Sequence, residues 1–116
     1  MVQMIMQLPD DLAEKIRPLG LWMPTLLELS FVGFKTLATA TATEVTEFLT
    51  RNPSPHEVLS FHVSDQAQAK LRRLLTLNQA GLLAEAEQLE LDELQQLEHI
   101  LIMLKAQVGQ TLRRNP

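Results

Sequence analysis

The stretch LDELQQLEHILIMLKAQV, residues 91–108, decides the fold of this 116-residue chain. Within it, apolar side chains recur at alternating steps of three and four residues, at Leu94, Leu97, Leu101, Leu104 and Val108. That spacing places them on one face of an α-helix and is typical of a seam that other helices cover. We expect a long amphipathic helix over 85–113, with its seam packed against helices of this chain or of a partner.

A second helix is predicted just before the long one. Ser64 is a good N-terminal cap, and Leu71, Leu74 and Leu75 recur at helical spacing after it. Gly81 is a natural left-handed stop. We therefore expect a helix over 65–79 and a helical hairpin that turns at Gly81.

Four further helices are expected over 10–17, 24–36, 42–51 and 55–60. The one at 24–36 is apolar on nearly every side, which predicts that it is the central element of the core. Thr41 and Glu44 have the spacing of a capping box, as do Ser54 and Glu57, so each pair should open a helix. The run 36–40 has no clear pattern and is expected to be a connector.

The start of the chain reads differently. Val2, Met4, Met6 and Leu8 alternate with Gln3, Ile5 and Gln7, the two-residue period of a half-buried strand over 2–8. The predicted fold is thus mainly α, a single domain over 1–116. It has one short N-terminal β-strand, four or five helices and a C-terminal helical hairpin.

Composition limits the function. The net charge of −4, with acidic and basic residues mixed along the chain, disfavours nonspecific binding of nucleic acid. The chain contains no cysteine, which excludes disulfides, thiolate zinc sites and cysteine nucleophiles. We find no signal peptide and no long uncharged apolar run, so we expect a cytoplasmic protein without a membrane segment.

The N-terminal strand followed by two helices resembles the ribbon-helix-helix arrangement of small bacterial antitoxins and repressors. In that family two strands pair across a dimer and read base edges in the major groove. The resemblance implies that Gln3 and Gln7 would contact bases and that Lys15 and Arg17 would contact phosphates. The alternative is a strand that pairs in a dimer or at the edge of the fold without contacting DNA.

The second half, from Leu71-Arg72-Arg73-Leu74 through Glu90-Leu91-Asp92-Glu93-Leu94 to Leu104-Lys105-Ala106, together with the LPDDLA stretch at 8–13, resembles small uncharacterised bacterial proteins described as antitoxin-like. The family pattern commonly has Ser or Thr at the position of Ala84. Alanine has no side-chain oxygen, so the last helix of this chain lacks that side-chain cap. The resemblance implies a role as the antitoxin component of a toxin–antitoxin pair.

Catalysis is not indicated. The three histidines form no i, i+4 ligand pair, and the position three before His99 is Gln96, not the Glu of a di-metal bundle. Glycines are isolated, so no phosphate-binding loop is predicted. We expect no enzyme activity, cofactor or metal. The expected role is a protein-interaction module that binds a partner, a toxin by the resemblance, through the seam Leu94, Leu97, Leu101, Leu104 and Val108. The alternatives are a DNA-binding autoregulator and a structural homodimer.

Overall fold

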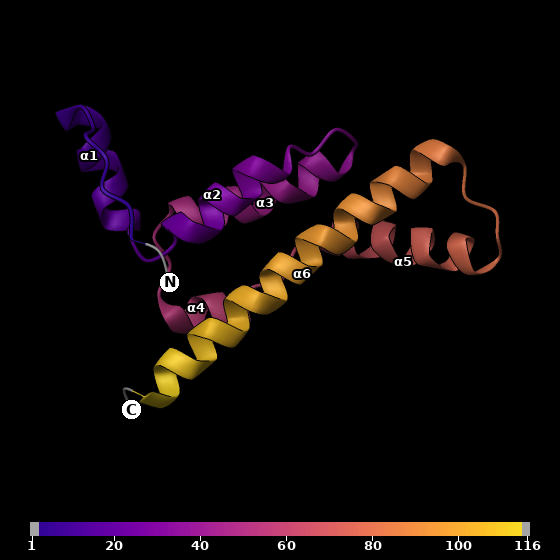
Figure 1. Cartoon of the computed structure of the whole chain (residues 1–116). Helices are drawn as coiled ribbons and strands as arrows, with labels where there is room; N and C mark the ends of the chain where they lie inside the picture. Colours follow the sequence, from indigo (N-terminus) through magenta and orange to yellow (C-terminus); the bar gives the residue numbers. More distant parts are fainter. Residues whose placement is uncertain (1–2, 115–116) are drawn as a thin grey trace.

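The computed structural model describes residues 3–114, which form an all-helical bundle (Figure 1). Its elements are α1 (Asp10–Ile16), a 3-10 turn η1 (Arg17–Leu19), α2 (Met23–Val32), α3 (Ala38–Thr50), α4 (Pro55–Ser60), α5 (Asp65–Gln79) and α6 (Glu85–Arg114). The mainly α class is confirmed. The β-strand predicted over 2–8 is wrong: residues 3–9 have no regular secondary structure, and residue 2 lies outside the described residues.

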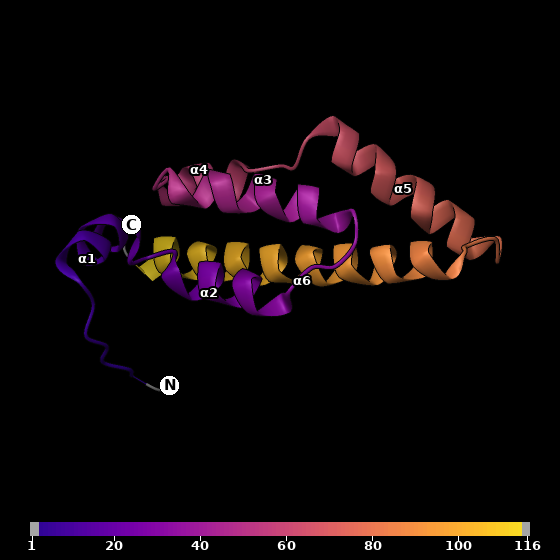
Figure 2. The same ribbon diagram turned by 90° about the horizontal axis from the view of Figure 1, so that it is seen from above.

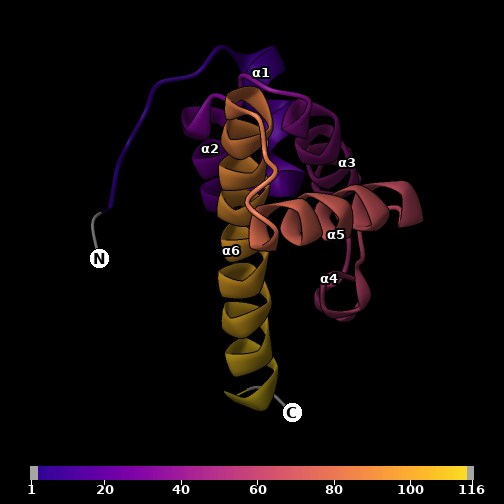
Figure 3. The same ribbon diagram turned by 90° about the vertical axis from the view of Figure 1, so that its right-hand side faces the viewer.

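The long helix α6 is the centre of the fold. It has 30 residues, about 45 Å at 1.5 Å per residue, and the longest dimension of the molecule is 49 Å. α2 lies along one flank of α6, and α3, α4 and α5 lie along the other (Figure 2, Figure 3). Helices of the same chain therefore pack along the length of α6. The central element of the core is α6, and not the 24–36 segment as predicted.

The larger core cluster joins the C-terminal half of α6 to α2, α3 and α4. Trp22, just before α2, is 1% exposed, and its indole Nε1–H donates to the Pro53 carbonyl at 3.1 Å. This bond links the start of α2 to the connection between α3 and α4. Val45, Leu49 and Val58 are buried beside it. No periodic pattern in the sequence marks Trp22, the only tryptophan in the chain, as a core residue.

A smaller cluster joins α5 and the start of α3 to the N-terminal half of α6, through Ala38, Leu74, Leu91 and Leu94. The Lys70 ammonium pairs with the Glu90 carboxylate at 3.0 Å, and the Glu90 side chain is nearly buried. Phe34 packs against both clusters and so makes the core continuous. α5 and α6 are consecutive helices in contact, as the hairpin prediction requires, although they diverge along their length (Figure 2).

Local signals set several helix ends. The Ser54 and Glu57 capping box is formed, and the Ser64 hydroxyl accepts from the Ala67 N–H. Gly81 has φ of 71°, a left-handed conformation that favours glycine. The backbone N–H of Ala84 donates to the Glu87 carboxylate at 3.2 Å. Glu87 thereby supplies one half of a capping box, which offsets the missing hydroxyl at position 84.

The connection between α2 and α3 departs from the prediction. α2 ends at Val32, before Gly33 with φ of 62°, and α3 begins at Ala38. The run 36–40 is therefore partly helical, and Thr41 is buried inside the helix instead of capping it. The cause is a distant residue. The Glu93 carboxylate of α6 accepts from the backbone N–H groups of Lys35 and Thr36, so the chain enters α3 earlier than its local sequence suggests.

Candidate interaction surfaces

The leucine seam of α6 is covered by the chain itself. Leu94 and Leu97 are buried in the two core clusters, Leu104 and Val108 face α2, α3 and α4 residues, and Leu101 is half-buried. While the chain is folded in this way, four of the five side chains predicted to bind a partner are buried in its own core, and Leu101 packs at the edge of that core. The periodicity of the seam predicts that these side chains pack against other helices. It does not say whether those helices belong to the same chain or to a partner.

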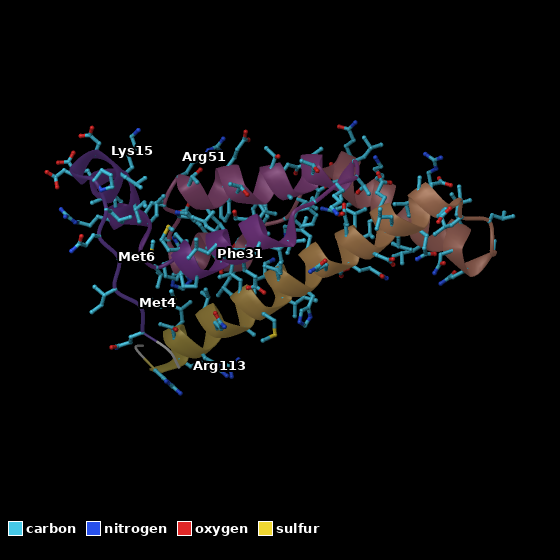
Figure 4. All side chains as sticks on the ribbon, turned by 45° about the horizontal axis from the view of Figure 1, so that its top comes forward. Met4, Met6, Lys15, Phe31, Arg51 and Arg113 are labelled. Atoms are coloured by element: carbon cyan, nitrogen blue, oxygen red, sulfur yellow. The ribbon has the colours of Figure 1, made fainter. Side chains whose placement is uncertain are left out.

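The opposite situation holds at the N-terminus. From Gln3 to Leu19, across the extended residues 3–9, α1 and η1, no residue is buried. We call residues 3–9 the arm. It stands apart from the helices (Figure 2, Figure 3), and Met4 and Met6 are exposed (Figure 4), as is Ile5 at 99%. The apolar side chains of this segment thus contribute almost nothing to the core of the chain.

Helix α1 has an apolar stripe without a partner. Leu12 is exposed, and Ile16 and Leu19 are only half-buried, although they share one face at helical spacing. Asp10 and Asp11 lie in the first turn and Lys15 in the last, which favours the helix dipole. The helix therefore has local reasons to form, but its apolar side lacks a complete cover.

The outer side of α2 exposes large apolar side chains beside the polar Glu28 and Ser30. Only Thr25 and Leu29 of this helix are buried, while Leu27 is exposed and Phe31 is 87% exposed. The sequence predicted burial on all sides. A helix that packs on one flank of a bundle presents only part of its circumference to the core, so the remaining apolar side chains face outward. The arm and α2 lie on the same flank of α6 (Figure 3).

The residues predicted to contact DNA are all exposed, but no strand holds them. Gln3 and Gln7 lie in the irregular arm, Lys15 in α1 and Arg17 at the start of η1. The ribbon-helix-helix resemblance depends on a strand over 2–8, which residues 3–8 do not form. The arrangement expected for base readout is therefore missing from the described chain.

A groove of about 380 Å³ lies on the other flank, between α5, α6 and the connection 61–64. Its wall is mainly apolar and includes Phe61, Val63, Leu71, Leu101 and Ile102. The charged groups at the groove are Arg72, Lys105 and Glu98, with His62 beside them. This volume lies near the lower end of the usual range for binding pockets. The groove could therefore hold a few apolar side chains of a ligand that also has a charged group close to them.

The connection that borders the groove is held in place by three helices. Lys105 of α6 donates to the Phe61 carbonyl at 2.6 Å, Gln68 of α5 donates to the Val63 carbonyl at 2.9 Å, and Glu44 of α3 accepts from the Ser64 N–H at 2.7 Å. The Phe61 ring stacks on Phe48 with 4.3 Å between ring centroids. The groove is therefore formed before any ligand arrives.

The buried acidic residue Glu93 on α6 has a structural role. Glu93 is buried and accepts from the Thr36 hydroxyl at 2.6 Å as well as from two backbone N–H groups. Burial raises the pKa of Glu93, but these hydrogen bonds and the charge of Lys35 together lower it by more, so the pKa lies below its ordinary value. Within residues 3–114, no three acidic or histidine side chains gather in a way that could hold a metal ion.

No helix of the described chain has both the length and the apolar character needed to cross a membrane. No protein family, curated protein or solved structure gives a significant match to the chain. The antitoxin-like resemblance consequently stays a prediction from the sequence.

Proposed function

We propose that the protein is a non-enzymatic interaction module that binds another protein through residues 3–19 and the exposed side of α2. One observation carries the proposal: the N-terminal segment has large apolar side chains along its whole length, yet none is buried. Burying one such side chain is worth about 1.5–3 kcal/mol. A segment that leaves several of them in water suits a surface that a partner covers.

Seven of the thirteen exposed large apolar residues lie between Met4 and Phe31, and the other six are spread over the rest of the described chain. Leu21 and Leu27 continue the apolar surface from the N-terminal segment onto α2, where Phe31 is the most exposed large side chain. Aromatic and methionine side chains are favoured at protein interfaces, and the arm carries two methionines. The seam of α6 takes no part in this proposal, because four of its five side chains are buried in the chain's own core and Leu101 lies at the groove on the other flank.

The sequence resemblance suggests a toxin as the partner, so the product of a toxin-like neighbouring gene is the first protein to test. We would co-express it with this chain and measure the mass of the complex by size-exclusion chromatography with light scattering. Replacing Leu12→Lys and Ile16→Lys together should abolish the complex. Because neither residue is buried, far-UV CD and the urea midpoint should hardly change.

The matched control is Glu14→Lys on the same helix. It changes the net charge by the same two units but leaves the apolar stripe intact. The control should bind as the unmodified chain does. A complex that survives the Leu12 and Ile16 substitutions, or one that the control weakens equally, would contradict the proposed surface.

A further inference from the structure

We propose that the groove between α5 and α6 receives the arm of a second copy of this chain. The inference rests on the proposed function, because it names one binding site for the exposed N-terminal segment: the groove of a second copy. It connects two features of the described chain: an extended segment whose apolar side chains are not buried, and an open groove with a mainly apolar wall.

The dimensions agree. The groove follows α6 from Leu94 to Lys105, eleven residue steps, or about 16 Å at 1.5 Å per residue. An extended chain advances about 3.3 Å per residue, so this length holds about five residue steps. Residues 4–9 of the arm span that number. Met4 and Met6 have flexible side chains that adapt to an irregular apolar wall.

The charges also agree. Two carboxylates, Asp10 and Asp11, follow the arm directly, and the groove has two cations, Arg72 and Lys105, against one acid, Glu98. Lys105 already donates to the Phe61 carbonyl. We therefore place the aspartates of the incoming chain next to Arg72.

The positions require a second copy. The arm lies on the α2 flank of α6, whereas α5 lies on the opposite flank (Figure 3), and α5 supplies part of the groove wall. A chain arranged in this way cannot fill its own groove. The contact joins two different surfaces, so it is heterologous: each copy offers an arm to one neighbour and a groove to the next, and the assembly grows with concentration unless a ring closes.

The first test measures the mass of the full chain by sedimentation velocity over a wide range of concentration. The weight-average mass should rise with concentration. Replacing Met4→Ser, Ile5→Ser and Met6→Ser together should leave a folded monomer at every concentration, because the arm is not part of the core. A monomeric unmodified chain, or an arm variant that still assembles equally, would overturn the inference.

The second test locates the site. A fluorescent peptide with the sequence of residues 1–14 is titrated with the full-length arm variant, and its anisotropy is recorded. Ile102→Glu, at a wall residue of the groove, should weaken binding about tenfold. Met103→Glu is the matched control: Met103 is the next residue, is exposed and does not line the groove, so affinity should stay within about twofold.

A charge exchange gives the orientation. Arg72→Glu should weaken binding of the native peptide, and a peptide with Asp10→Lys and Asp11→Lys should recover the lost affinity. A scrambled peptide that binds equally well, or equal affinities for the Ile102 and Met103 variants, would refute the groove as the site. The proposed function fails separately, when the Leu12 and Ile16 substitutions leave the complex with the partner protein intact.

Discussion

Replacing Glu93 with alanine should destabilise the protein more than any other single acidic substitution on α6. The carboxylate accepts from three donors: the Lys35 N–H at 2.9 Å, the Thr36 N–H at 3.0 Å and the Thr36 hydroxyl at 2.6 Å. Hydrogen bonds to a charged acceptor contribute about 1.5–3 kcal/mol each, but Lys35 is exposed and its N–H can bond to water in the variant. We therefore expect about 1 kcal/mol per donor, a total loss of about 3 kcal/mol.

Urea unfolding followed by far-UV CD at neutral pH measures this loss. Glu98→Ala is the control, because Glu98 is exposed on the same helix, and its effect should stay within about 0.5 kcal/mol. Glu93→Gln keeps the shape but loses the charge, so its loss should be about half that of Glu93→Ala. If Glu93→Ala costs no more than the Glu98 control, the reasoning about the connection between α2 and α3 is wrong.

The same bonds predict the pH dependence. The pKa of Glu93 is lowered in the folded protein, so the folded state binds this proton less readily than the unfolded state does. The stabilisation is complete above the ordinary carboxyl pKa, about 4.3 for glutamate, and is lost as the pH falls through the lowered value. The stability gap between the unmodified protein and Glu93→Gln should stay constant down to about pH 4.5 and then narrow. An unchanged gap in more acidic solution would refute the assignment.

Three further predictions concern stability, each measured as a free energy of unfolding in urea. Gly81→Ala should lower the stability by about 1 kcal/mol, because φ there is 71°. Gly109→Ala lies inside α6 with open space around it and should raise the stability by about 0.5–1 kcal/mol. If both substitutions change the stability in the same direction, this account is wrong. Trp22→Phe should cost about 2 kcal/mol, since it leaves the Pro53 carbonyl without its donor, and an intact urea midpoint would show that this bond is dispensable. Lys70→Ala should cost about 1 kcal/mol because Glu90 loses its cation, and the exposed Arg73→Ala on the same helix should cost less; equal losses would argue against the ion pair.

Elements with local signals could be predicted from the sequence. The bounds of α4 and α5 match the predicted 55–60 and 65–79 because Ser54 and Ser64 cap them through residues only three positions away. The long helix was readable from its periodicity, and the hairpin turn from Gly81. In each case the physical cause lies within a few residues of its effect.

The failures have distant causes. The arm alternates like a strand, but alternation makes a strand only when another strand is beside it, and the described chain offers none. The start of α3 depends on Glu93, which is 57 residues from Thr36 along the chain. The seam of α6 showed which side chains need a cover, while the identity of the cover depends on tertiary packing. The groove was not foreseen, because its wall combines residues from α5, α6 and the connection 61–64.

The position of α6 in the chain has a consequence for synthesis. Helices α2 to α5 leave the ribosome before the helix on which they pack. At about 5–20 residues per second, the 30 residues of α6 take about 1.5–6 s to make, and during that time the apolar sides of the earlier helices lack their main partner. A nascent chain stalled within α6 should therefore behave as an unfolded protein and not as a shorter folded domain. We expect chaperones to bind it until the last turns of α6 are available for packing.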